Sequence, residues 1–353
     1  MAVVFADPGG EYYFSTGLVA NIGIWNNSGG GANPVNSAPA GRQAANDGKF
    51  YGITLVSTGF VEKNFPTNYS HLITGFAMYF SSTAWTNNTP FFAFTDAGTA
   101  QCDIRTNGSG QVFFTRNGTV IGSTSTIALS GGWNYIEIEV LFATGATGSV
   151  QCWINGVSAT NTASVQTTTS GNAFANRIRY TSPNNGGTTY LKDVYLLDTT
   201  TGANTTRLGD ITVAVKYPNA AGTNQQWTPL SGTQVSNVQD GIDHTGTWPD
   251  GDTTYISDAT AGHISDFAHE TLTLTGTLLS VVHATYARKD DAGSRSFRQV
   301  CISGATTETN GSDISATNSY VYYFDVLDQD PNTSAQWTVA NYNAASFGVK
   351  EIT

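Results

Sequence analysis

Short β-type runs separated by turn signals fill most of this sequence, and they restrict the fold more than any other feature. Between Phe50 and Tyr217, runs rich in Thr, Val, Ile, Phe and Tyr alternate with Gly, Asn, Pro and Ser. Such residues favour half-buried strands, and many short strands at regular spacing are typical of a β-sandwich. We expect strands near residues 50–56, 72–80, 90–95, 101–105, 111–115, 133–142, 150–154, 175–180, 190–197 and 211–217.

Two hairpins are marked by Asn-Gly pairs between alternating runs. The pairs are Asn117-Gly118 and Asn155-Gly156. Type I′ turns need positive φ at both central residues, and Asn-Gly meets this need better than other pairs. The sequence therefore predicts tight two-residue turns at both places.

The composition excludes long helices, bundles and coiled coils. The chain of 353 residues has 51 Thr, 16 Tyr and 18 Phe, but only 15 Leu, 7 Glu and 6 Lys. Only 12% of residues are charged, whereas about 25% is usual. Thr, Ser and Asn together number 108, so neutral hydroxyls and amides must cover much of the surface.

Charge and cysteine content limit the partners and the compartment. The formal net charge is -11, which disfavours nucleic acid and anionic membranes as partners. The first residues do not form a secretory signal, and no apolar run is long enough to span a bilayer. Cys102, Cys152 and Cys301 lie in strand-like runs without metal or redox spacing, so we expect buried free thiols and assembly in a reducing cytoplasm.

The chain length favours two domains. We expect an N-terminal arm or first strand over residues 1–48, a β-sandwich over 49–217, an acidic connection over 218–252, and a smaller C-terminal β-sandwich over 253–353. The C-terminal part has strand-like runs near 278–288, 296–303, 320–326 and 347–352, and one short helical turn within 339–346. The first of these runs is apolar on both faces, which predicts a central strand.

Two carboxylates lie on one face of the predicted strand 133–142. Glu137 and Glu139 are two residues apart, or roughly 6.6 to 6.8 Å along a strand, a spacing that would suit the acid and base of a glycosidase. The alternative is a solvated sheet face with Ile136, Ile138 and Val140 packed inward. The second reading is favoured, because the longer acidic motif of sandwich-fold glucanases is missing.

An acidic stretch offers candidate ligands for a cation. Asp240, Asp243, Asp250 and Asp252 supply clustered hard oxygen atoms, which Ca²⁺ accepts, although their spacing does not match an EF-hand. A flexible acidic connection explains the cluster equally well, and no cofactor is required. Three histidines of the same region lack zinc-site spacing, and surface or capping roles are expected for His244, His263 and His269.

Four tryptophans in loop-like segments are candidates for stacking on sugar rings. These are Trp85, Trp227, Trp248 and Trp337. Each lies near Pro, Asn or Gln, and the competing role is to close the end of a sandwich or an interdomain seam. No nucleophile elbow, P-loop or dinucleotide fingerprint occurs, so the sequence predicts no enzyme.

Three segments resemble the concanavalin A-like, laminin G-like jelly-roll superfamily. They are Trp133-Asn-Tyr-Ile-Glu-Ile-Glu-Val, Ser149-Val-Gln-Cys-Trp-Ile-Asn-Gly-Val and Lys192-Asp-Val-Tyr-Leu-Leu-Asp. The resemblance covers roughly residues 50–217 and implies an all-β jelly-roll sandwich. It implies no single function, because the superfamily contains lectins, glucanases and structural modules.

A narrower resemblance is to structural proteins of tailed bacteriophages that join a jelly roll to a C-terminal β domain. It rests on Gly209-Asp-Ile-Thr-Val-Ala-Val, Trp227-Thr-Pro, Pro249-Asp-Gly-Asp-Thr-Thr-Tyr, Tyr286-Ala-Arg-Lys-Asp-Asp-Ala-Gly, Asp330-Pro-Asn-Thr-Ser-Ala-Gln-Trp and Asn343-Ala-Ala-Ser-Phe-Gly-Val. It implies a non-enzymatic virion component that is built in the host bacterial cytoplasm and displayed on the particle. No catalytic residues carry over.

The resemblance leaves several roles open. A tail or baseplate appendage or head fibre is the leading expectation, with other virion proteins as partners, a homo-oligomeric state and contact with host surface glycans. The alternatives are a capsid decoration protein or a lectin-like carbohydrate-binding module outside a virion. A glycan-cleaving enzyme would need Glu137 or Glu139. The predicted arm 1–48 would dock onto another virion protein.

Overall fold

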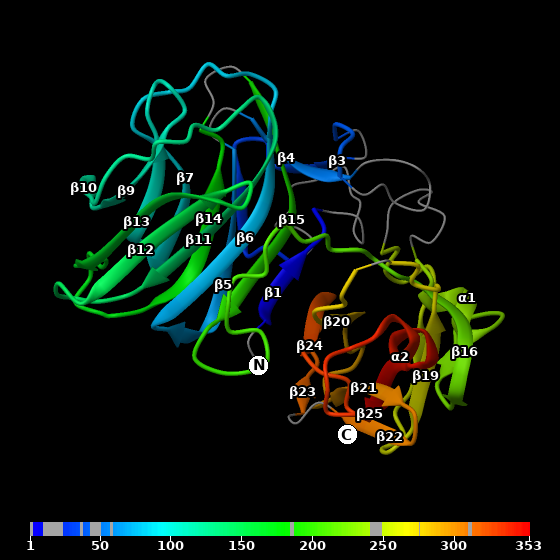
Figure 1. The fold of residues 1–353 in the computed structure, drawn as a ribbon. Helices are drawn as coiled ribbons and strands as arrows, with labels where there is room; N and C mark the ends of the chain where they lie inside the picture. The colour runs from blue at the N-terminus through cyan, green and yellow to red at the C-terminus, as the bar shows by residue number, and fades with distance from the viewer. Residues whose placement is uncertain are drawn as a thin grey trace. The chain divides into compact units, whose positions relative to one another are not determined.

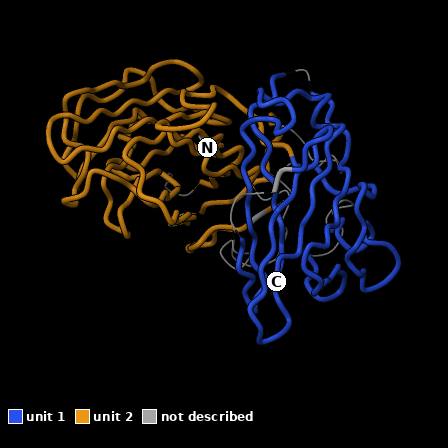
Figure 2. The backbone as a smooth tube through the Cα atoms, turned by 90° about the horizontal axis from the view of Figure 1, so that it is seen from below, with its two compact units in different colours: residues 1, 12–14, 215–353 blue, residues 2–11, 15–214 orange. Residues whose placement is uncertain are grey.

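The computed structural model describes residues 3–9, 24–35, 38–42, 51–56, 59–183, 187–240, 249–274, 276–309 and 313–353. The chain divides into two compact units, one extending to Ala214 and one from Val215 to the end (Figure 2). We call them the sandwich unit and the C-terminal unit. No helix among these residues is long and apolar enough to cross a membrane.

The sandwich unit consists of two antiparallel sheets, which form the two layers visible in Figure 1. The first sheet has the order β13-β12-β11-β6-β15-β4-β3, and β1 also pairs with β15. Its strands are β1 (Val3–Asp7), β3 (Asn33–Val35), β4 (Gly52–Val56), β6 (His71–Phe80), β11 (Gly132–Leu141), β12 (Gly148–Ile154), β13 (Val157–Val165) and β15 (Thr188–Asp198).

The second sheet has the order β10-β9-β8-β7-β14-β5-β2. Its strands are β2 (Asn27–Gly29), β5 (Phe60–Tyr69), β7 (Thr89–Asp96), β8 (Thr99–Thr106), β9 (Val112–Arg116), β10 (Thr119–Ile121) and β14 (Ala175–Thr181). The inward side chains of both sheets form one aromatic core, in which Phe76 stacks on Phe92 at 5.8 Å and meets Tyr180 edge-on at 4.9 Å. This architecture confirms the predicted all-β sandwich.

Both predicted hairpins are present. Asn117 and Gly118 join β9 to β10 with φ values of 48° and 77°. Asn155 and Gly156 join β12 to β13 with φ values of 50° and 79°. Positive φ at both central positions identifies the expected type I′ geometry.

The described part of the predicted N-terminal arm differs from a free arm. β1 pairs with β15, β2 with β5, and β3 with β4. Phe5 in β1 is buried and meets the buried Trp25 edge-on at 5.3 Å. These strands therefore belong to the sandwich. Strand pairing satisfies their backbone hydrogen bonds there, and aromatic packing buries their apolar side chains.

The C-terminal unit is smaller and also mostly β. A six-stranded sheet has the order β16-β19-β25-β21-β22, with β23 also paired to β21, and β17–β18 and β20–β24 form two small sheets. The elements are β16 (Pro218–Gln225), β17 (Thr228–Pro229), α1 (Gln234–Val238), β18 (Ile256–Ser257), β19 (Ile264–His269), β20 (Val281–Ala287), β21 (Ser296–Ser303), β22 (Thr306–Thr309), β23 (Ile314–Ser315), β24 (Val321–Leu327), α2 (Val339–Ala344) and β25 (Ser346–Glu351). Helix α2 confirms the predicted helical turn.

Three organisational predictions are wrong, each for a long-range reason. The expected connection 218–252 contributes β16 to the six-stranded sheet, where Asp266 accepts hydrogen bonds from the backbone of Thr223 and Asn224 at 3.0 and 2.7 Å. The expected central strand 278–288 is β20, whose one strand partner among the described residues is β24. A side chain of the larger sheet takes the place of a further strand here, because the Gln299 amide of β21 donates to the His283 carbonyl at 2.9 Å. The expected strand 211–217 has no strand geometry over residues 211–217.

Candidate functional site

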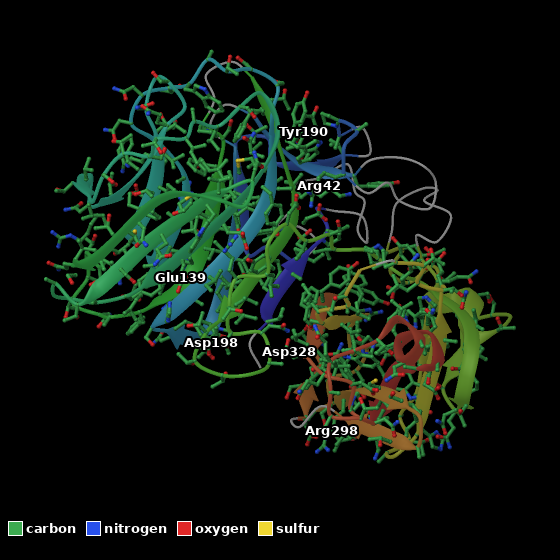
Figure 3. All side chains as sticks on the ribbon, viewed as in Figure 1. Arg42, Glu139, Tyr190, Asp198, Arg298 and Asp328 are labelled. Atoms are coloured by element: carbon green, nitrogen blue, oxygen red, sulfur yellow. The ribbon has the colours of Figure 1, made fainter. Side chains whose placement is uncertain are left out.

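The outer face of the first sheet carries the two carboxylates that sequence analysis considered for chemistry, Glu137 and Glu139. In β11, Ile136, Ile138 and Val140 are fully buried in the core. Because side chains alternate along a strand, the intervening Trp133, Tyr135, Glu137 and Glu139 lie on the outer face. Figure 3 labels Glu139, Tyr190 and Arg42 among the side chains of the sandwich unit.

Glu137 is held in a buried polar cluster on this face. Its side chain is 1% exposed. Its Oε1 atom accepts hydrogen bonds from the Tyr195 hydroxyl at 2.6 Å and from the Gly209 backbone N–H at 2.8 Å. Its Oε2 atom accepts a hydrogen bond from Nη1 of Arg207. Three donors therefore satisfy a carboxylate that would otherwise be costly to bury.

The donors come mainly from residues 199–214, which we call the strap. The strap follows β15 and crosses the outer face over β11 and β15. The Arg207 guanidinium lies 4.7 Å from the centre of the Trp153 ring, and the Leu208 N–H donates to the Tyr195 hydroxyl at 3.3 Å. The strap thus takes the place of solvent above Glu137.

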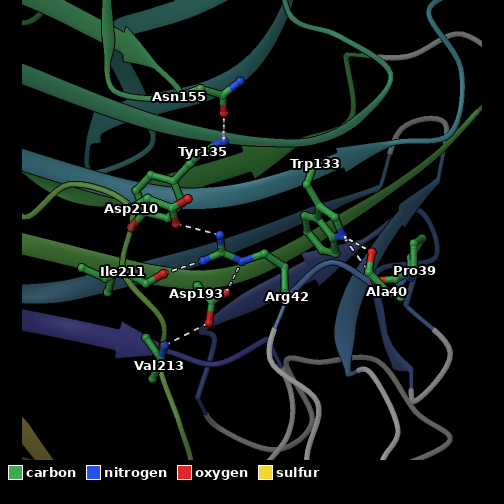
Figure 4. A network of polar contacts seen from close by, with 10 residues as sticks. All are labelled: Pro39, Ala40, Arg42, Trp133, Tyr135, Asn155, Asp193, Asp210, Ile211 and Val213. Atoms are coloured by element: carbon green, nitrogen blue, oxygen red, sulfur yellow. Dashed lines mark hydrogen bonds and ion pairs between the residues drawn. The ribbon is translucent and has the colours of Figure 1, made fainter. Parts of the chain in front are cut away.

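A second set of ion pairs anchors the strap near its end (Figure 4). Nε of Arg42 donates to Asp193 at 2.8 Å, and Nη1 of Arg42 donates to Asp210 at 2.6 Å. Arg42 also donates to the Ile211 carbonyl, while the Val213 N–H donates to Asp193 at 2.9 Å. Burial raises the pKa of Asp193, and the Arg42 charge opposes that rise.

A glycine under Tyr195 makes this arrangement sterically allowed. Gly75 of β6 pairs with both Glu137 and Tyr195. A Cβ atom at Gly75 would lie 2.1 Å from Cε1 of Tyr195. The missing side chain therefore lets the Tyr195 ring lie flat over β6 and reach Glu137.

We expect Gly75→Ala to lower the free energy of unfolding of the sandwich unit by about 2 to 3 kcal/mol, because the new methyl group overpacks the site. Urea unfolding monitored by intrinsic fluorescence checks this value. Gly131→Ala is the matched control, since a Cβ there meets Thr83 at an ordinary 3.4 Å. Equal midpoints for both variants would show that Tyr195 is not fixed over β6.

The two carboxylates of the predicted pair, Glu137 and Glu139, lie in different environments. Glu137 is enclosed by its three donors, whereas the Glu139 side chain is 25% exposed and contacts Nε2 of His71 at 2.9 Å. The inward packing of the isoleucines is confirmed, but the face over Glu137 is not solvated. A general acid or base must reach its substrate, and Glu137 has the geometry of a structural carboxylate.

Beside the cluster, three aromatic residues form a row across neighbouring strands. Trp133 of β11 pairs with Tyr79 of β6, and Tyr79 pairs with Tyr190 of β15. Their ring centres are 5.4 and 5.9 Å apart, with edge-to-face geometry. All three are partly exposed. We call this set the aromatic row.

The row is held by the backbone around it. Trp133 Nε1 donates to the carbonyls of Pro39 and Ala40 at 3.2 and 3.1 Å. Its indole N–H is thus satisfied while the ring stays partly open. Three rings on adjacent strands span about 10 Å, since strands lie about 4.8 Å apart. Such a row can contact two successive sugar rings through their CH groups.

Sequence analysis missed the aromatic row, because its members come from three strands that are distant in the sequence. The odd-numbered positions of β6 and β11 are visible as an alternating face. The register that aligns Tyr79 with both Trp133 and Tyr190 is set by strand pairing and has no local signal.

The four tryptophans selected from the sequence do not converge. Trp85 is half-buried, meets Phe80 edge-on at 4.9 Å and packs on Gly110, which matches the competing role of closing a sandwich end. Trp227 is half-buried in the C-terminal unit and donates to the His263 carbonyl at 3.4 Å. Trp337 is 2% exposed and donates to the Leu327 carbonyl at 2.9 Å, so its assignment as a sugar-stacking residue is wrong. Trp248 lies outside the described residues.

The acidic residues suggested for Ca²⁺ do not form a joint site in the described part of the chain. Asp240 and Asp250 both accept hydrogen bonds from the Thr254 hydroxyl, at 3.1 and 2.9 Å. Asp252 instead pairs with Arg288 at 2.8 Å. No group of three His, Cys, Asp or Glu side chains with metal-binding geometry occurs among the described residues. Asp243 lies outside them.

The histidines and cysteines divide between surface and core. His263 is partly exposed and contacts Asp258 at 2.7 Å, and His269 is also partly exposed and packs edge-on against Phe347 at 5.4 Å. His244 lies outside the described residues. Cys102, Cys152 and Cys301 are buried and form no disulfide within the described part of the chain, as predicted.

Comparison with known proteins gives distant structural matches that cover about half of this chain. No family model matches the sequence, and no curated protein matches it. Solved structures similar to this chain include an endo-β-1,4-glucuronan lyase from the fungus Trichoderma reesei, at 14% identity and a TM-score of 0.39, over 55% of this chain and 95% of that one. An alginate lyase from Aplysia kurodai matches at 9% identity and 0.39, over 56% and 100%.

A third similar structure is domain 4 of an extracellular arabinanase from Geobacillus stearothermophilus, in complex with arabinotriose. It matches at 13% identity and a TM-score of 0.36, over 56% of this chain and 92% of that one. The sandwich unit is a two-sheet antiparallel β-sandwich. The likeness concerns the fold alone.

Proposed function

We propose that this chain is a non-enzymatic structural protein displayed on a tailed-phage virion, and that its sandwich contacts host surface glycans through the aromatic row. The single observation that carries the glycan contact is the in-register alignment of Trp133, Tyr79 and Tyr190, whose side chains are all partly exposed on one face. Partly exposed aromatic rings are suitable partners for the apolar faces of sugars.

The non-enzymatic role is supported by the state of Glu137. Both of its oxygen atoms are occupied by protein donors, and the strap covers it. A catalytic carboxylate at this position would need the strap to leave and Arg207 to be displaced. The polar cluster therefore favours a binding function on this face over glycan cleavage.

The virion location rests on the phage-protein resemblance of the segments between Gly209 and Val349. Buried free cysteines are compatible with assembly in the host bacterial cytoplasm. Other virion proteins are the proposed partners, with neither nucleic acid nor membrane as a target. A tail or baseplate appendage and a head fibre are the two placements that leave the sandwich exposed.

We expect Trp133→Ala to weaken glycan binding at least tenfold, or about 1.4 kcal/mol, because it removes the largest ring of the aromatic row. Titration calorimetry of the whole chain with purified host surface polysaccharide measures the effect. Trp227→Ala is the matched control, since Trp227 is also half-buried but lies in the other unit. Loss of binding in the control alone would assign the glycan to the C-terminal unit.

A separate experiment tests whether the chain cleaves glycans. The chain is incubated with the same polysaccharide, and released reducing ends are counted. Sustained release would contradict a non-enzymatic role. If the double variant Glu137→Gln with Glu139→Gln still released reducing ends, neither carboxylate could be the catalytic group.

Immunogold electron microscopy of purified particles tests the location. Label at the tail end supports an appendage, and label over the head supports a head fibre or a capsid decoration protein. Absence of label, with an antibody that recognises the native chain, would overturn the virion assignment in favour of a lectin-like module.

A further inference from the structure

One end of the sandwich is made from a part of the chain that carries no charge. Residues 117–136 and 140–176 contain no Asp, Glu, Lys, Arg or His, in runs of 20 and 37 residues. The second run includes all of β12 and β13. Two copies of a chain with net charge -11 repel each other over most of their surfaces. Through these strands they can approach without like charges meeting.

Strand β13 ends the first sheet and has an open outer edge. It pairs with β12 alone. Within the described parts of the chain, no backbone hydrogen bond joins residues 157–165 to any other segment. Natural proteins protect such edges with Lys, Pro or short length, because an open edge templates further strand pairing. β13 has nine residues, Val-Ser-Ala-Thr-Asn-Thr-Ala-Ser-Val, and contains neither Lys nor Pro, although irregular pairing with β12 near both ends limits its regular part.

The middle of β13 is the regular part of this edge. Register shifts occur at both ends of its pairing with β12, and between them Thr160, Asn161, Thr162 and Ala163 pair without interruption. Thr160 points inward, where its hydroxyl donates to the Ser123 carbonyl at 3.0 Å. Asn161 and Ala163 lie on the outer face and are exposed. The regular stretch thus combines a fixed inner face with a free outer face.

We propose that β13 pairs antiparallel with β13 of a second copy of this chain, with the two-fold axis near Asn161. The occupant is a second copy because the edge is self-complementary: it is uncharged, and its regular stretch is centred where the axis would pass. A symmetric edge pairing of this kind is an isologous interface. It extends the first sheet continuously from one copy into the other.

The pairing has a consequence for binding that rests on the proposed glycan contact. The two-fold axis between antiparallel strands is perpendicular to the sheet, so both copies present the outer face of the first sheet on the same side. The two aromatic rows of the dimer then face one direction. A long polysaccharide or a dense glycan surface can engage both, and the second contact is made at high effective concentration.

Sedimentation equilibrium of the full chain tests the interface. The wild type is expected at twice the monomer mass of 37.3 kDa. Asn161→Asp combined with Ala163→Asp places like charges across the axis, and the dimer dissociation constant should rise at least tenfold. The matching Lys pair at the same two positions should have the same effect. An equimolar mixture of the two variants should regain the dimer.

Thr99→Asp combined with Ser109→Asp is the matched control, since it adds the same two charges at exposed positions outside the first sheet. It should leave the dimer unchanged. The proposal is overturned by a monomeric wild type, by a dimer that tolerates charges on β13, or by failure of the mixed variants to associate. Melting temperatures of all variants show whether any of them has lost its fold.

Simultaneous binding by the two aromatic rows of the dimer is tested separately. A negative result can then be distinguished from failure of the glycan contact itself. Binding of the Asp variant to immobilised polysaccharide should be at least tenfold weaker than wild type, with unchanged affinity for a short soluble oligosaccharide. Equal binding of both proteins to the surface would overturn the bivalent arrangement. Loss of oligosaccharide binding in the wild type would instead reject the proposed function.

Discussion

Replacing Glu137 with Ala is expected to destabilise the sandwich unit by about 3 to 5 kcal/mol, because it leaves Arg207 and the Tyr195 hydroxyl without their buried acceptor. For a unit of this size, such a change lowers the melting temperature by on the order of 10 °C. Differential scanning calorimetry of the full chain measures it. Glu137→Gln should fall between the wild type and the Ala variant, since the amide keeps the shape and loses the charge.

Glu139→Gln is the matched control on the same face of β11. The Glu139 side chain is 25% exposed and contacts only His71 among the described residues, so its removal should change stability by less than about 1 kcal/mol. A different result would identify Glu137 as catalytic: the wild type cleaves glycans, and a Glu137 variant keeps wild-type stability but loses this activity. The structural assignment would then be wrong.

Acidification from pH 8 to pH 5 is expected to destabilise the C-terminal unit by about 4 kcal/mol through two histidines. Burial lowers the pKa of His269 to about 4, and burial together with the nearby His269 lowers the pKa of His283 to about 3. Both rings pack against Phe347, at 5.4 and 5.8 Å. The folded state thus holds both imidazoles neutral.

The direction of this pH dependence follows from the different histidine pKa values of the folded and the unfolded chain. In the unfolded chain both histidines take up protons near the ordinary pKa of 6.5, whereas the folded chain resists protonation until about pH 4. Stability is therefore complete above pH 7 and falls as the pH decreases below 6.5. Carboxylates titrate mostly below pH 5, so the upper part of this window belongs to the histidines.

Urea unfolding at pH 8, 6 and 5 measures the loss. His269→Phe combined with His283→Phe should make the C-terminal transition nearly independent of pH in this range. His71→Phe, on the sandwich unit, should leave that dependence intact. A loss that persists in the double variant, or that begins only below pH 4, would assign the acid sensitivity to carboxylates.

The local parts of the fold could be predicted from the sequence, and the long-range parts could not. The Asn-Gly turns at 117–118 and 155–156 are set by the φ preferences of their own residues. β16 was not expected, since its Pro, Gly and Asn content favours a loop and its pairing depends on Asp266 in another strand. Strand 211–217 was expected from its β-branched residues, but hydrogen bonds from Arg42 to the Ile211 carbonyl and from the Val213 N–H to Asp193 hold its first part in the strap.

The candidate site shows the same division. Alternation in β11 predicted that Glu137 and Glu139 share a face, which the structure confirms. Nothing local indicated that Tyr195 and Arg207, which are 58 and 70 residues away in the sequence, would enclose Glu137. The aromatic row escaped prediction for the same reason. Trp337 was misassigned because a Pro- and Asn-rich neighbourhood also occurs where a loop folds back over a core.

The strap also determines how the sandwich would bear mechanical load. The chain leaves the sandwich unit at Ala214, directly after Val213, whose N–H is bonded to the buried Asp193. Tension applied through the following residues would first reach Asp193 and Arg42, and then Arg207 at Glu137. These are ion pairs and hydrogen bonds on the outer face, and they are loaded one after another before the force reaches the end of β15 at Asp198. The sandwich core is therefore shielded from force by a series of polar contacts that can break and re-form.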